Sequence, residues 1–163
     1  MRKLFKKITA VVAAATMVMA MGVTAFAAEY EAATLAPGTY TVKSTLYKDA
    51  ACTSTSMGNQ GMTDSTLTVK EDGSVVFEFK TIKFTYIGMS GYLNVMSLDG
   101  VSGDHTSYTE GDYEYHVFTF NNSLALSKFS VGNVFTGEFT MKIAGIINRD
   151  GTGYLKIDSI TAN

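Results

Sequence analysis

The 163-residue chain has one cysteine, one proline, two histidines and no tryptophan. Because Cys52 has no second cysteine to pair with, an internal disulfide is excluded and the fold must rely on its core. His105 and His116 show no spacing typical of a zinc site, and no structural metal is expected. The chain also lacks the Gly-x-Ser-x-Gly, His-Glu-x-x-His and phosphate-loop motifs. We therefore expect a protein that is not an enzyme.

Residues 1–27 have the pattern of a signal peptide. A basic start is followed by an apolar run over residues 8–23, and Ala25-Phe26-Ala27 has the small-x-small form of a cleavage site. Cleavage after Ala27 would leave one domain, residues 28–163. We expect it to be secreted, either free outside the cell or loosely held at the cell wall, with no membrane contact after cleavage.

The charge balance argues against two classes of partner. Four of the 13 Lys and Arg residues lie in residues 1–27, which leaves nine against 15 Asp and Glu, a net charge of about −6. A mildly acidic domain is a poor match for nucleic acid or for an anionic membrane surface.

The remaining sequence has a period of two, which is typical of β-strands. Polar and apolar residues alternate from Tyr40 to Tyr47, and similar short runs follow at regular spacing. Strands are predicted at 40–47, 67–70, 75–79, 84–87, 92–96, 113–120, 135–147 and 154–160. A long loop or loose hairpin is expected at 98–112, and a turn at 148–153. The pattern predicts an all-β, antiparallel sandwich of about 7–8 strands; a lipocalin-like barrel also fits the strand count.

One short segment carries a resemblance. Thr55-Ser56-Met57-Gly58-Asn59 lies between the strand-like runs 35–47 and 67–70. This order resembles the opening of a NEAT domain, the Ig-like haem-binding module exported by Gram-positive bacteria. The resemblance covers nearly all of residues 28–163 and implies an Ig-like sandwich in which the Ser-Met segment closes over a porphyrin. By this resemblance Ser56 would hold a propionate and Met57 would pack on the ring face.

The last hairpin departs from the family pattern. NEAT domains that bind haem carry two tyrosines four residues apart on the last strand, where residues four apart face the same side. The first ligates iron and the second hydrogen-bonds to the first. Aligned without gaps, Tyr154 takes the second place and Asp150 the first; aligned the other way, Asp158 takes the second. Because aspartate is a poor haem ligand, half of the pair is missing. Tyr154 is expected to stack on the ring or ligate the iron; the alternative is an ordinary cross-strand packing residue.

Methionine offers another ligand. Met141 lies on the penultimate strand beside the predicted pocket, and methionine can be an axial haem ligand, although core filling is the alternative for each methionine. The predicted function is binding of haem, or another flat apolar ligand, for iron acquisition outside the cell. The alternative is a protein-binding or adhesion module that has lost haem binding, whose partner is a host haemoprotein or another surface protein.

Overall fold

The computed structural model describes residues 35–86 and 88–163. The predicted signal peptide lies outside this part of the chain. The described residues form ten strands and two short 3₁₀-helices. The elements are β1 (Gly38–Tyr47), η3 (Met57–Gly61), β2 (Ser65–Val69), β3 (Val75–Ile82), β4 (Phe84–Tyr86), β5 (Met89–Leu98), β6 (Val101–Ser102), β7 (Asp104–Glu110), β8 (Tyr113–Asn121), η4 (Leu126–Lys128), β9 (Val134–Ile143) and β10 (Ile147–Ala162).

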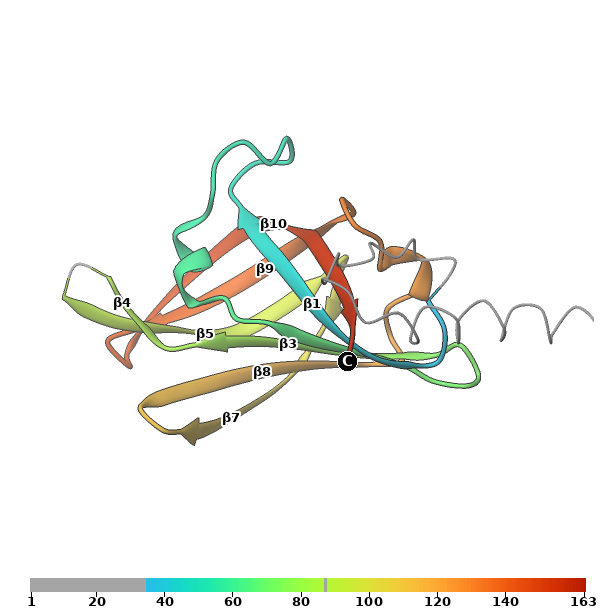
Figure 1. The fold of residues 1–163 in the computed structure, drawn as a ribbon. Helices are drawn as coiled ribbons and strands as arrows, with labels where there is room; N and C mark the ends of the chain where they lie inside the picture. The colour runs from blue at the N-terminus through green and yellow to red at the C-terminus, as the bar shows by residue number, and fades with distance from the viewer. Residues whose placement is uncertain (1–34, 87) are drawn as a thin grey trace, which may run out of the picture.

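All of the strand pairs are antiparallel and belong to one sheet, in the order β4-β5-β9-β10-β1-β2-β3-β8-β7, with β6 beside β5. The sheet folds over on itself, so that β5 also lies near β3 and β8 (Figure 1). The prediction of an all-β antiparallel fold is confirmed, and the architecture is consistent with a β-sandwich. The strand count exceeds the predicted 7–8, because residues 98–112 contribute β6 and β7.

The core forms from the side chains on the inward-facing side of the strands. Phe77 and Phe79 point to the same side of β3 and are both about 1% exposed. The ring of Phe77 lies 5.1 Å from that of Phe129 and 6.2 Å from that of Phe120, in centroid distance. Phe79, two residues further along β3, lines the cavity described below. The aromatic core and the cavity are therefore continuous.

A bulge resets the alternation in β5. The register with β9 shifts between Leu93 and Val95. Leu93 is buried before the shift, and Met96 and Leu98 are buried after it, whereas Val95 is 49% exposed. The extra residue of a bulge changes which side chains face inward, and both halves of β5 thereby contribute to the interior.

The turn between β9 and β10 lies earlier than the sequence pattern predicts. β9 ends at Ile143, and Ala144 and Gly145 make the turn with φ angles of 50° and 72°. The amide of Ile146 donates to the carbonyl of Ile143 at 3.2 Å and closes it. Residues 148–153, predicted as a turn, instead pair with β9 over their whole length. The long last strand therefore carries residues 149–153 alongside the cavity.

The first and last strands are neighbours in the sheet. β1 pairs with β10 from Tyr40 to Tyr47, and the amide of Asn163 donates to the carbonyl of Thr39 at 3.1 Å. Within the described part of the chain, no helix has the length and apolar character needed to cross a membrane.

Candidate functional site

Residues Ser56–Gly61, called the lip below, form a short helix held at the end of β1. Ser56 is the N-cap of η3, and its Oγ accepts a hydrogen bond from the amide of Gly58 at 3.3 Å. Two further hydrogen bonds fix the lip to β1. The amide of Ser56 donates to the carbonyl of Leu46 at 2.8 Å, and the amide of Leu46 donates to Oδ1 of Asn59 at 3.0 Å. The position of the lip over the sheet is thus set by backbone groups of β1.

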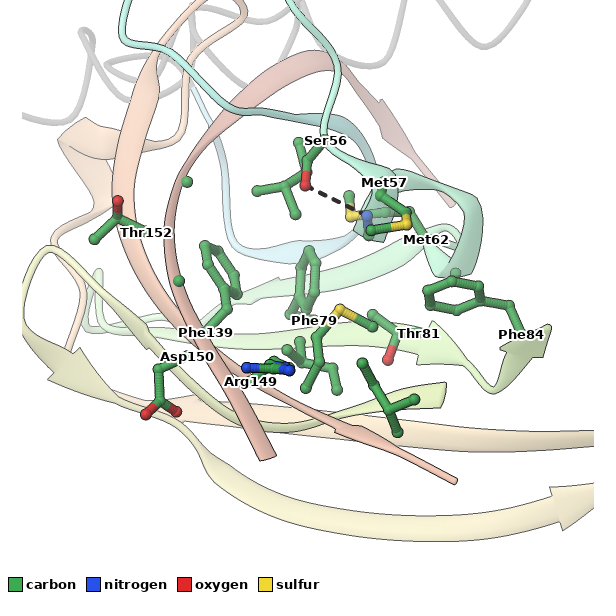
Figure 2. Close-up of a pocket in the computed structure, with 18 of the residues that line it drawn as sticks. Ser56, Met57, Met62, Phe79, Thr81, Phe84, Phe139, Arg149, Asp150 and Thr152 are labelled. Carbon is green, nitrogen blue, oxygen red and sulfur yellow. Dashed lines mark hydrogen bonds between the residues drawn. The ribbon is translucent and has the colours of Figure 1, made fainter. Parts of the chain in front are cut away.

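A cavity of about 400 Å³ lies beneath this lip. Its volume falls in the range of ~300–1,000 Å³ that is typical of small-molecule sites. Figure 2 shows Ser56 and Met57 of the lip, with Met62 directly after it, on one side and Phe79, Phe84 and Phe139 around the interior. The complete lining is Leu46, Ser56, Met57, Gly58, Gly61, Met62, Phe79, Thr81, Ile82, Phe84, Leu93, Phe139, Met141, Ile143, Arg149, Asp150, Gly151, Thr152 and Gly153.

Three of the four predicted ligand-binding residues meet here. Ser56, Met57 and Met141 all line the cavity, whereas Tyr154 does not. The two neighbours of Tyr154 on β10, Gly153 and Leu155, are both buried, and side chains alternate along a strand, so Tyr154 points to the opposite face. Tyr154 does not line this cavity, so its predicted contact with a ligand, as stacking partner or iron ligand, stays a prediction that the cavity does not support.

All five residues of β10 from 149 to 153 line the cavity. Strand alternation turns Arg149, Gly151 and Gly153 toward it. Arg149 pairs with Met141 and Gly151 pairs with Phe139, and all four of these residues line the cavity. The two positions four residues apart are therefore Arg149 and Gly153, rather than Asp150 and Tyr154. Neither can supply a phenolate. The alignment with NEAT domains could not show which of these residues face the cavity. It treated residues 148–153 as a turn, and side chains alternate between two faces only in a strand.

Gly153 has no room for a larger side chain. A Cβ there would lie 3.0 Å from Cδ1 of Leu46 and 3.2 Å from Cε2 of Phe139. The ring of Phe139 and the side chain of Leu46 therefore occupy the space beside position 153. The potential metal ligands inside the cavity are the thioethers of Met57, Met62 and Met141.

The positive charge at the edge of the cavity comes from Arg149, which lines the cavity but is exposed. The adjacent Asp150 points away from the interior (Figure 2), and its Oδ1 accepts a hydrogen bond from Oγ1 of Thr140 at 2.6 Å. Within the described residues, Arg149 makes no ion pair. An apolar cavity with an unpaired guanidinium at its edge matches a ligand that is mostly apolar and carries an anionic group.

A second group of titratable residues lies on β7 and β8. Nε2 of His105 and Nδ1 of His116 are 3.0 Å apart, so one proton is shared between them. The ring of Tyr92 stacks on His116 at 4.2 Å, and Nε2 of His116 lies 3.4 Å from Oε1 of Glu114. Burial lowers the pKa of both histidines. No group of three or more His, Cys, Asp and Glu suited to a metal ion occurs in residues 35–86 and 88–163.

Comparison with known proteins adds no assignment: no protein family matches the chain, and no curated protein does either. The cavity is therefore the main structural feature that points to a function.

Proposed function

We propose that the protein binds a flat, apolar molecule that carries a carboxylate, of the porphyrin class, without catalysing a reaction. The observation that carries this proposal is the apolar cavity beneath the Ser56–Gly61 lip with the unpaired Arg149 at its edge. The resemblance to NEAT domains supports the same ligand class and a role in iron acquisition outside the cell. Cavity and resemblance are independent arguments, because the first depends on geometry and the second on sequence order.

Binding would depend mainly on burial of the ring. The interior is lined by Phe79, Phe139 and Leu93, and burying apolar surface stabilises a complex by ~25 cal/mol per Å² before the costs of association. Arg149 would bind a carboxylate, and the hydroxyl of Ser56 can still donate a hydrogen bond while its oxygen accepts one from Gly58. If the ligand is haem, the soft donors available to iron are the methionine thioethers at the lip and on β9.

The proposal predicts a selective effect of Arg149. Porphyrin binding to the purified protein is measured by absorbance and fluorescence titration, with haem, metal-free protoporphyrin and its dimethyl ester. Loss of a charge-assisted hydrogen bond is worth about 1.5–3 kcal/mol, so Arg149→Gln should weaken binding of the free carboxylates by about tenfold or more. The ester should be affected little. Met57→Ala should weaken the binding of all three ligands, because the substitution removes an apolar contact that the lip makes.

Two matched variants serve as controls. Lys142→Gln removes a positive charge from β9, at a residue that does not line the cavity, and should bind like the parent protein. Tyr154→Phe removes the hydroxyl group of a side chain on the opposite face of β10, and this variant should also bind porphyrin normally. Absence of saturable binding with every porphyrin would overturn the proposal.

That negative result would favour the alternative, a protein-binding module. The observation in its favour is the exposed apolar side chains on the lip and on the β4–β5 and β9–β10 hairpins near the cavity. Ile146 is 83% exposed, and Ile147, Met57 and Met89 are each between 42% and 47% exposed. Side chains of this kind in one region are typical of contact surfaces.

A further inference from the structure

A small recess adjoins the main cavity and has a different chemistry. Its volume is about 60 Å³, and its six lining residues are Met57, Phe84, Met89, Gly91, Met141 and Ile143. Half of them are methionines, which come from three separate elements: η3, β5 and β9. Met89 lines only this recess, whereas Met62 lines only the main cavity.

Gly91 lines the recess and leaves space in it because it has no side chain. In the sheet Gly91 lies between Phe84 of β4 and Ile143 of β9, and the residues two places before Gly91 and Ile143 are Met89 and Met141. Residues two apart in a strand face the same side, so both thioethers flank the space above Gly91. The Cε atom of Met141 lies 3.8 Å from the position that a Cβ of residue 91 would take.

The volume and the lining limit what the recess can hold. A water molecule has a share of about 30 Å³ in the liquid, so this space suits a single ion and is too small for an organic ligand. None of the six side chains offers an oxygen or nitrogen atom. The only donors are three uncharged thioethers, and thioether ligands select soft ions such as Cu(I).

The charge of the ion also matters. Transfer of an ion from water into an apolar surrounding is costly, and in the Born picture that cost rises with the square of the charge. Neutral thioethers cannot compensate the cost of removing a divalent ion from water. A monovalent soft ion keeps this transfer cost low. Met57 and Met89 are 44% and 47% exposed, which gives an ion a route from solvent to the three sulfur atoms.

We propose that Met57, Met89 and Met141 form a binding site for a soft monovalent cation, Cu(I), above Gly91. The site shares Met57 and Met141 with the larger cavity and adds Met89, which takes no part in that cavity. Met89 therefore allows the site to be tested separately from the porphyrin proposal. Occupation of the recess would hold the lip to β5 and β9, since one sulfur comes from the lip itself.

The test uses the full chain with Cys52→Ser, because a free thiol would compete for the metal. Cu(I), kept reduced by ascorbate, is titrated against the chelator bathocuproine disulfonate. Met89→Leu should weaken Cu(I) binding at this site by about tenfold or more, since even changes around a metal's ligands cost ~10–100-fold. Met62→Leu is the matched control and should bind like the parent. Equal affinity in the Met89→Leu and Met62→Leu variants would overturn the proposal.

A second measurement locates the ion directly. With methionine methyl groups labelled with ¹³C, addition of Ag(I), an inert substitute for Cu(I), should shift the signals of Met57, Met89 and Met141. The signals of Met62 and of the buried Met96 should stay in place. If the Met89 signal does not move, the site is refuted, whatever binds elsewhere in the chain.

A variant that fills the recess gives a further check. At position 91 the nearest atoms to a Cβ are 3.5–3.8 Å away, which is ordinary contact, so Gly91→Ala should fold normally. It should nevertheless weaken Cu(I) binding, because the added methyl occupies the space of the ion. Porphyrin binding by the Met89→Leu variant separates the two proposals: retained porphyrin binding with lost Cu(I) binding supports both sites as distinct.

Discussion

Glycine at position 137 determines where the ring of Phe139 can lie. A Cβ at this position would overlap the Phe139 ring, which is two residues away on the same strand. The ring thus occupies the space that a side chain at 137 would need. Because Phe139 also lines the cavity, this single glycine affects both the packing of β9 and the shape of the site.

This contact leads to a prediction for stability. Gly137→Ala should lower the free energy of unfolding by about 1–3 kcal/mol, the usual cost of overpacking, as measured by urea denaturation. Gly151→Ala is the control, because Gly151 faces the same cavity and nothing lies within 4 Å of its Cβ position. Its effect should stay within about 0.5 kcal/mol. If Gly137→Ala left the free energy of unfolding unchanged, the Phe139 ring would be able to move aside without cost.

At the scale of elements, the lip depends on its first residue. Ser56→Ala removes the side-chain cap of η3, which typically costs about 0.5–2 kcal/mol. The bond to Gly58 is long at 3.3 Å, so we expect the lower part of that range. In the Ser56→Ala variant, the amide hydrogen of Gly58 should exchange faster with solvent, and porphyrin binding should be weaker.

Ser54→Ala is the matched control for the lip, because its side chain is exposed and lies two residues before the cap. It should leave both the exchange rate and the affinity unchanged. An unchanged Gly58 amide in Ser56→Ala would show that the hydrogen bonds to Leu46 alone hold the lip.

The elements also show how far sequence patterns reach. Alternation predicted the strands correctly where one face is buried, as in β1 and β3, because burial imposes the period of two. It missed β7, since all seven of its residues are exposed and no apolar side chain marks an inner face. Composition misplaced the last turn, because Asn148, Asp150 and Gly151 are typical of turns but are tolerated in an exposed strand. Ser56, Met57 and Met141 were predicted at the site; Arg149 required the correct register of β10.

At the scale of the whole molecule, the histidine pair couples stability to pH. Desolvation lowers the pKa of His105 from its ordinary value of 6.5, because its ring stacks on Phe118 although the residue as a whole is exposed. Burial also lowers the pKa of His116; the charge of Glu114 opposes this shift, and those of His105 and Lys83 add to it. Below pH 6.5 the unfolded chain therefore binds more protons than the folded one. Stability should fall as the pH drops from about 7 to about 5, since folding then excludes protons that the unfolded state accepts.

Urea denaturation at several pH values measures this slope. His105→Gln removes one of the two titrating groups and should make the dependence between about pH 7 and about pH 5 shallower. Thr106→Gln, at the next position on β7, should keep the slope of the parent. A slope that is identical in His105→Gln would assign the dependence to other groups.

The pairing of β1 with β10 also fixes how the molecule presents its cavity. Thr39 and Asn163 are bonded to each other, and β1 runs from there to Leu46 at the cavity, seven residues or roughly 23 Å away. A surface or fusion partner joined at Asn163 would therefore hold the protein with the cavity facing outward. Attachment through the β9–β10 turn at Ile146 would bring the support close to the cavity instead. The choice of attachment point thus decides whether an immobilised molecule can still exchange ligand with its surroundings.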